Sequence, residues 1–228
     1  MERHWAAVRR WGAISKEARA GRYSWRWFMR CLGIGALTTF VMAGLALAAS
    51  PEPRPVIEEL NATLLEVMQD ADRLGYPGRY ERLEPVLEES FNFPFMVRVA
   101  VGGAWRDLTE EEQARLTGLF TEMSIATFAA RFDGHGGEWF EIVAEGQAPR
   151  DAVLIETRIV EPADKPVSLS YVLKPFDGRW RIIDIFAESK FSELARQRAE
   201  FGGVLRGGGV RGLLATLQQK IGELSDEG

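Results

Sequence analysis

The sequence predicts an α+β domain in which a curved four-stranded antiparallel sheet is covered by helices, with an apolar cavity between the two layers. Apolar residues recur with a helical period before the glycine-rich segment 133–137 and with a period of two after it. Asp177-Gly178 stands between two alternating runs and predicts a hairpin, because such residues tolerate the positive φ of a tight turn. The strand that follows is apolar on both faces over residues 182–186. Either both faces of the sheet are covered by protein, or one face lines an apolar cavity.

Composition is ordinary for one globular domain plus an extra segment, with 228 residues of which 46% are hydrophobic. Charge is unevenly distributed. Residues 1–48 carry eight Lys/Arg and two Asp/Glu, whereas the rest of the chain has a net charge of −11. Because nucleic-acid binding depends on neutralising phosphates, no nucleic-acid partner is expected. The one cysteine, Cys31, lies in the N-terminal segment, so the rest of the chain has neither a disulfide nor thiol chemistry.

The N-terminal segment has the layout of an export signal. A basic lead is followed by 17 uncharged, largely apolar residues at 31–47 and by the small-residue site Ala46-Leu47-Ala48. This order predicts that residues 1–48 are a signal peptide and that residues 49–228 form a single exported domain. The apolar run is at the edge of membrane-spanning length, so an uncleaved anchor is the alternative.

Helical periodicity precedes the glycine-rich segment and predicts four helices, at residues 55–74, 80–90, 91–101 and 110–132. Gly75-Tyr76-Pro77-Gly78 is expected to end the first helix. Pro85 is expected to mark the first turn of the second. Thr109 and Glu112 form a capping box at the start of the longest helix.

Alternating apolar residues then predict four strands, at residues 138–145, 151–161, 166–176 and 179–188. Sequential strands joined by short turns form an antiparallel meander. Two more helices are expected at 192–205 and 210–224, separated by Gly207-Gly208-Gly209. The single domain therefore has helices in 55–132, a sheet in 138–188 and helices in 192–224.

Few residues suit catalysis. His135 is the only histidine after the N-terminal segment, so a histidine-based zinc site or a Ser-His-Asp triad is not expected, and we expect no metal and no cofactor. One alternative is a small enzyme of the ketosteroid-isomerase type, with Asp184 as a general base whose pKa is raised in an apolar pocket. The competing interpretation is that Asp184 pairs with Arg181, Arg158 or a helix end, or faces water.

Several short motifs also occur in a specific order. These are Phe91-Asn92-Phe93, Gly103-Ala104-Trp105-Arg106, Thr109-x-x-Glu112-Gln113, Asp177-Gly178-Arg179-Trp180-Arg181-Ile182-Ile183-Asp184 and Arg198-x-x-Phe201. In this order and spacing the chain resembles the MlaC-like family of periplasmic lipid carriers, or toluene-tolerance auxiliary family, over about residues 55–220. The segment 196–201 departs from the family's common pattern and resembles the hopanoid-associated HpnM branch.

The resemblance implies a periplasmic shuttle without enzymatic activity that carries phospholipid or hopanoid between the inner and outer membranes. The implied partners are an inner-membrane ABC transporter with an MCE-type subunit and an outer-membrane lipid-exchange complex. If the N-terminal segment is retained, the carrier is tethered to the inner membrane. A membrane-anchored assembly factor without cargo is a further alternative.

The lipid cavity is expected to be lined by apolar side chains of the longest helix and the strands. The candidates are Leu119, Met123, Phe128, Ile155, Ile159, Leu169, Tyr171, Leu173, Ile183 and Ile185. Because opposite faces of a strand cannot both point inward, part of this set is expected to face elsewhere.

Overall fold

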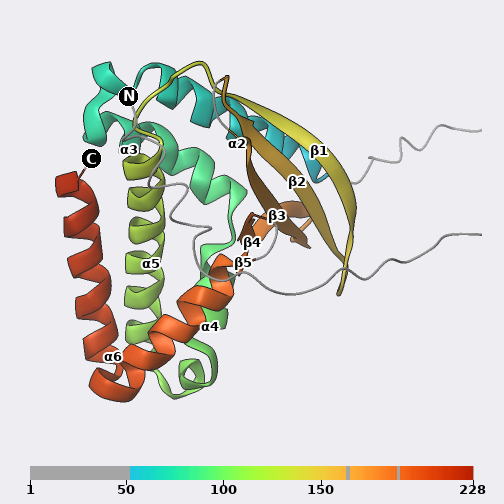
Figure 1. Ribbon diagram of the computed structural model, residues 1–228. Coiled ribbons are helices and arrows are strands. Elements are labelled where there is room, and N and C mark those ends of the chain that lie inside the picture. The colour runs from blue at the N-terminus through green and yellow to red at the C-terminus, as the bar shows by residue number, and fades with distance from the viewer. Residues whose placement is uncertain (1–51, 163–164, 189–190, 228) are drawn as a thin grey trace, which may run out of the picture. The chain divides into compact units, whose positions relative to one another are not determined.

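The structure is a computed structural model that describes residues 52–162, 165–188 and 191–227. The predicted signal peptide or anchor, residues 1–48, lies outside the described residues. None of the helices in those three ranges combines the length and the apolar character that a membrane span needs. Figure 1 shows a layer of helices beside one curved antiparallel sheet. The predicted α+β fold is thereby confirmed.

Helices make up most of the described chain before the sheet. They are α2 (Arg54–Gln69), α3 (Ala71–Ser90), α4 (Phe93–Val101), the 3₁₀ helix η1 (Gly102–Asp107) and α5 (Glu110–Arg131). The predicted capping box is present: the Thr109 side chain accepts from the backbone N–H of Glu112, whose carboxylate accepts from the backbone N–H of Thr109. α4 likewise begins at a side-chain cap, because Asn92 Oδ1 accepts a hydrogen bond from the backbone N–H of Phe95 at 2.9 Å.

The expected four-residue break between the first two helices is wrong. α2 ends at Gln69, and α3 begins at Ala71 and is interrupted at one residue only, Gly75, with φ 59°. Helical structure resumes at once, and Pro77 then falls in the first turn after the interruption, where a missing N–H is tolerated. Pro85 was expected to start a helix but lies inside α3.

The sheet is a meander with strand order β1-β2-β3-β4-β5. Its strands are β1 (Trp139–Ala148), β2 (Ala152–Val160), β3 (Val167–Phe176), β4 (Arg179–Ala187) and the two-residue β5 (Phe191–Ser192). All neighbouring strands pair antiparallel, which confirms the four-stranded meander and adds a short fifth strand. The β3–β4 turn is the predicted tight hairpin, with positive φ at both Asp177 (49°) and Gly178 (76°).

A β-bulge in β4 explains why this strand is apolar at consecutive positions. Leu173 pairs with Ile182 and Val172 pairs with Asp184, so Ile183 is an extra residue without a partner in β3. Before the bulge the buried residue is Ile182, and after it the buried residues are Ile185 and Ala187. The buried face therefore shifts by one position along the strand, which period-two alternation does not anticipate.

β4 is joined to helices on the side opposite β3. The backbone N–H of Asn92 donates to the carbonyl of Ile182 at 2.9 Å, and Phe91 forms a parallel bridge with Ile182. Arg181 Nη1 donates to the carbonyls of Glu88 (2.9 Å) and Phe91 (3.2 Å). These bonds fix the α3–α4 junction to the sheet.

The last element, α6 (Glu193–Glu227), is one helix interrupted at Gly209, where φ is 61°. In Figure 1 the part before Gly209 runs away from the sheet, and the part after it returns along α5. Lys220 and Glu200 form an ion pair across the bend. The two predicted C-terminal helices are therefore present, and the break between them is confined to Gly209.

Candidate functional site

Nine of the ten candidate lining residues share one hydrophobic core between the sheet and the helices. Those that are buried are Met123, Phe128, Ile155, Ile159, Leu169, Tyr171, Leu173 and Ile185. Leu119 is half-buried against the same core. Ile183 is also half-buried, but it is the unpaired residue of the β4 bulge and does not belong to the core. Their assignment as the lipid lining stays a prediction.

The strand register brings the sheet residues of this set side by side on one face. Ile155 of β2 lies opposite Tyr171 of β3, which lies opposite Ile185 of β4. The polar Thr157 shares this face, but its hydroxyl donates to the carbonyl of Leu169 at 3.0 Å. We call this surface of β2, β3 and β4 the inner face. Tyr171 is fully buried in it, and that burial raises the pKa of its hydroxyl.

Aromatic rings form the helical side of the same core. Phe91 stacks on Phe93 with ring centroids 5.3 Å apart, and it meets Phe128 edge-on at 5.7 Å. Phe120 of α5 meets Phe201 of α6 edge-on at 6.2 Å. Sequence analysis did not select Phe91, Phe93, Phe120 or Phe201 as lining residues, although three of them belong to the motifs that carry the family resemblance. Those motifs were the signal in the sequence that could have pointed to these aromatic residues.

The sheet approaches the helices mainly along its sides. Cα atoms lie within 8 Å of each other between β4 and α3, α4 and α6, and between β1 and α2. The closest approaches of the helix backbone to the sheet are therefore at β1 and β4, and the central strands β2 and β3 meet the helices through their side chains in the shared core.

Asp184 lies in β4, and its side chain caps the start of α6. Its Oδ1 accepts from the backbone N–H groups of Ile185 (2.8 Å) and Leu194 (3.0 Å), and its Oδ2 accepts from the Ser192 hydroxyl (2.5 Å). Burial raises the pKa of this carboxyl, and the hydrogen bonds from Ser192, Leu194 and Ile185 oppose that effect. Of the two interpretations of Asp184, the contacts match the one that pairs it with a helix end.

His135 also has a structural contact, since its Nε2 lies 3.1 Å from the carbonyl oxygen of Glu138. Among the described residues, no group of three or more His, Cys, Asp or Glu side chains is arranged to hold a metal ion. The described part of the chain therefore offers no arrangement of this kind for metal chemistry.

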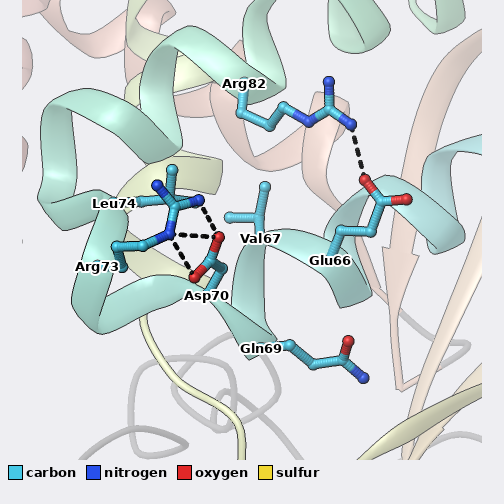
Figure 2. Close-up of a pocket in the computed structure, with 7 residues that line it drawn as sticks. All are labelled: Glu66, Val67, Gln69, Asp70, Arg73, Leu74 and Arg82. Atoms are coloured by element: carbon cyan, nitrogen blue, oxygen red, sulfur yellow. Dashed lines mark hydrogen bonds and ion pairs between the residues drawn. The ribbon is translucent and has the colours of Figure 1, made fainter.

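A separate surface pocket lies where α2 meets α3, with a volume of about 520 Å³ (Figure 2). It is lined by Glu66, Val67, Gln69, Asp70, Arg73, Leu74 and Arg82. Its charged residues form pairs. Arg73 donates from Nε to both carboxylate oxygens of Asp70, at 2.8 and 2.9 Å, and Arg82 donates to Glu66 at 2.8 Å. The hydrogen bond from Arg73 lowers the pKa of Asp70. Sequence analysis missed this pocket because it was directed at apolar positions.

Comparison with known proteins agrees with this architecture. The sequence model of the MlaC protein family matches residues 58–219, which is most of the chain. The chain belongs to the MlaC family. Its membership was predicted from short motifs, and the family assignment confirms that part of the resemblance. The HpnM branch stays a prediction.

The MlaC fold is also seen in a solved structure with low sequence identity. A phospholipid-binding protein from Ralstonia solanacearum, solved in complex with a phospholipid, is similar to 77% of this chain over 99% of its own length. The TM-score is 0.68 and the sequence identity is 18%, so this likeness concerns the fold. No curated protein matches the chain in sequence.

Proposed function

We propose that this MlaC-family protein is a carrier that binds a phospholipid and holds its acyl chains between the inner face and the helices. The observation that carries the proposal is the apolar inner face of β2, β3 and β4, which shares one hydrophobic core with the aromatic side chains of the helices. The complex of the Ralstonia solanacearum protein with a phospholipid supports the choice of ligand. A carrier role requires no catalytic group, in keeping with the capping contacts of Asp184.

The energetics of the cargo require an enclosed site. Burying a methylene group is worth about 0.8 kcal/mol, so two acyl chains of about 15 carbons each cost on the order of 24 kcal/mol when exposed to water. A carrier that crosses water must therefore cover most of both chains. Met123 suits this role, because an unbranched thioether side chain repacks easily around a ligand.

The setting of this transport is also a proposal. We place the carrier in the periplasm, where it moves lipid between the inner and outer membranes, since residues 1–48 have the layout of an export signal. It exchanges lipid with an MCE-type subunit of an inner-membrane transporter and with an outer-membrane complex. The segment 196–201 supports a hopanoid as the alternative cargo.

The first test is native mass spectrometry of the exported protein, purified without detergent from the periplasmic fraction, followed by extraction and lipid analysis. One phospholipid per protein is the expected result. One hopanoid per protein would keep the carrier and change its cargo. A bare protein mass, with no lipid gained from phospholipid vesicles, would overturn the proposal and favour an assembly factor.

A matched pair of substitutions tests the location of the site. Met123→Trp adds bulk to a buried position of α5, and Glu122→Trp adds the same ring at the next, exposed position. If the acyl chains occupy this core, the added ring takes up space that they need, and an overpacking cost of about 1–3 kcal/mol that falls on the lipid-bound state corresponds to about 5- to 150-fold weaker phospholipid binding. Glu122→Trp is expected to bind as the unaltered protein does. Equal binding by both variants, at equal thermal stability, would place the lipid outside this core.

A further inference from the structure

β1 leaves one side of the sheet unpaired. It is a ten-residue strand that pairs with β2, and the described residues supply no strand to its other side. The exposed large apolar side chains of the described residues are Trp139 and Val143, each 42% exposed, and both lie in β1. An unpaired strand edge and exposed apolar side chains thus coincide in one element. Each feature on its own favours association with another chain.

The two side chains are held in defined positions. Trp139 Nε1 donates to Glu141 Oε1 at 2.9 Å, which fixes the exposed indole above the strand. Val143 is the extra residue of a bulge, because Ile142 pairs with Thr157 and Ala144 pairs with Glu156. Tryptophan is enriched among the residues that dominate interface energies, and a preordered indole loses little entropy on binding.

Charge identifies the kind of partner. β1 carries Glu141 and Glu145, both exposed, and it contains no Lys or Arg. Across β2, Arg158 lies opposite Glu141 and Ile155 lies opposite Glu145, so the two glutamates project from opposite faces of the sheet and β1 itself carries two negative charges. A second copy pairing with this edge would bring two such acidic strands together, and like charges on paired strands are destabilising. The edge of β1 therefore disfavours pairing with a second copy of the chain and favours pairing with a strand of opposite charge.

From these observations we infer that the outer edge of β1 is a docking strand for an extended segment of a partner protein that carries Lys or Arg. The segment adds to the sheet beside β1 by main-chain hydrogen bonding, contacts Trp139 and Val143, and places its cations near Glu141 and Glu145. The inference goes beyond the proposed lipid carriage, because β1 is an edge strand and the inner face belongs to β2, β3 and β4.

The test is a selection of random 12-residue peptides, displayed on phage, on the immobilised full chain. Enriched peptides are expected to alternate Lys or Arg with β-branched or aromatic residues. A synthetic copy of one enriched peptide is then titrated against Glu141→Lys/Glu145→Lys and against Glu59→Lys/Glu81→Lys, which makes the same charge change at exposed positions of α2 and α3. We expect at least about tenfold weaker binding to the first variant, since like-charge juxtaposition costs several kcal/mol, and little change for the second.

Two further measurements identify the surface. Hydrogen exchange with the peptide bound is expected to slow in residues 139–148, and Trp139→Ala is expected to weaken binding about 30-fold, as for a central interface tryptophan.

Selection of acidic or uncharged peptides, equal binding to both charge variants, or protection confined to other elements would overturn the inference. Concentration-dependent dimers abolished by Trp139→Ala would assign the edge to a second copy, and binding to anionic phospholipid vesicles abolished by it would assign the edge to a membrane. Phospholipid uptake by Trp139→Ala is expected to be unchanged, because Trp139 lies opposite Val160 on the other face of the sheet from Ile155, so a failure here is distinct from a failure of the carrier proposal.

Discussion

β1 and β4 are both interrupted by one extra residue, but their surroundings differ. The bulge residue of β4, Ile183, lies between two attachments of the strand: the bond from Asn92 to Ile182 and the pairing of Phe186 with Ser192 of β5. The bulge residue of β1, Val143, lies on an edge to which the described residues add no strand. The same local irregularity thus occurs at an enclosed side and at an open side of one sheet.

This contrast separates structural roles from binding roles. In β4 the bulge changes which side chains enter the core, and it brings Asp184 to the start of α6. In β1 the strand is largely exposed and its irregularity projects Val143 into solvent. We therefore expect substitutions in β4 to act on stability and substitutions in β1 to act on association.

The largest effect is expected from Ile185→Ala, which deletes a buried side chain next to Tyr171. Truncating a buried isoleucine lowers the free energy of unfolding by about 2–5 kcal/mol. Val143→Ala is the control on the other bulged strand, with an expected loss below about 0.5 kcal/mol. Urea denaturation measures both. Losses of equal size would remove the distinction between the two strands.

The next effect is expected from Asp184→Ala, which removes the acceptor of three hydrogen bonds, from Ile185 in β4 and from Ser192 and Leu194 at the start of α6. Hydrogen bonds to a charged group contribute about 1.5–3 kcal/mol, and loss of a helix cap costs about 0.5–2 kcal/mol. We expect the free energy of unfolding to fall by about 2 kcal/mol. Glu145→Ala, the truncation of an exposed carboxylate in β1, should change it by less than about 0.5 kcal/mol. If Asp184→Ala were as stable as Glu145→Ala, the carboxylate would have no capping role.

A smaller effect concerns pH. Because burial raises the folded-state pKa of Asp184 above its ordinary value of 3.8, the folded protein binds this proton more readily than the unfolded chain. The contribution of Asp184 to stability therefore falls as pH rises from about 3.8 through the raised pKa, at up to about 1.4 kcal/mol per pH unit. Asp184→Asn should remove this fall.

Unfolding curves between pH 3.5 and pH 7 measure it. Ser192→Ala is the control, since it removes the hydrogen bond to Asp184 and the one from the backbone N–H of Ala195 but keeps the titrating carboxyl, and the contribution of Asp184 should still fall with rising pH. If Asp184→Asn and the unaltered protein ran parallel over this range, burial would not be perturbing the carboxyl.

The smallest effect on folding is expected from Trp139→Ala. Trp139 is 42% exposed and its indole donates to the exposed Glu141, so the free energy of unfolding should change by less than about 0.5 kcal/mol. Trp180→Ala on β4 is the comparison, because that indole packs against the core and its loss should cost more. Thermal unfolding of both variants measures the difference. A larger loss for Trp139→Ala would give β1 a structural role.

Local signals predicted much of this fold. The capping box at Thr109, the hairpin at Asp177-Gly178 and the α+β order are all confirmed. Each depends on a few neighbouring residues whose backbone requirements are specific. The exposed edge at Trp139 carried no comparable signal, since its exposure depends on what the rest of the chain leaves uncovered.

Features that depend on register were not predicted. In the sequence, the bulge at Ile183 shows only as apolar residues on both faces of a strand. This pattern predicts a sheet that is covered on both faces or lines a cavity, whereas its cause in the structure is the bulge. Similarly, the sequence predicts the end of a helix at Gly75 and Pro77, although a single residue with positive φ suffices to redirect the chain. The contact between Phe120 of α5 and Phe201 of α6 was not predicted either, because it depends on how the two helices pack against each other.

The position of α6 in the chain has a consequence for biosynthesis. Phe201, Leu213 and Leu217 of α6 are buried and belong to the same core as α4 and α5, which precede them by some hundred residues. The helical layer therefore stays incomplete on the ribosome until residue 217 has been translated. The meander joins only consecutive strands, so its pairings can form earlier. A nascent chain arrested before Gly209 would present a paired sheet above an open apolar surface, which is the kind of intermediate that chaperones recognise.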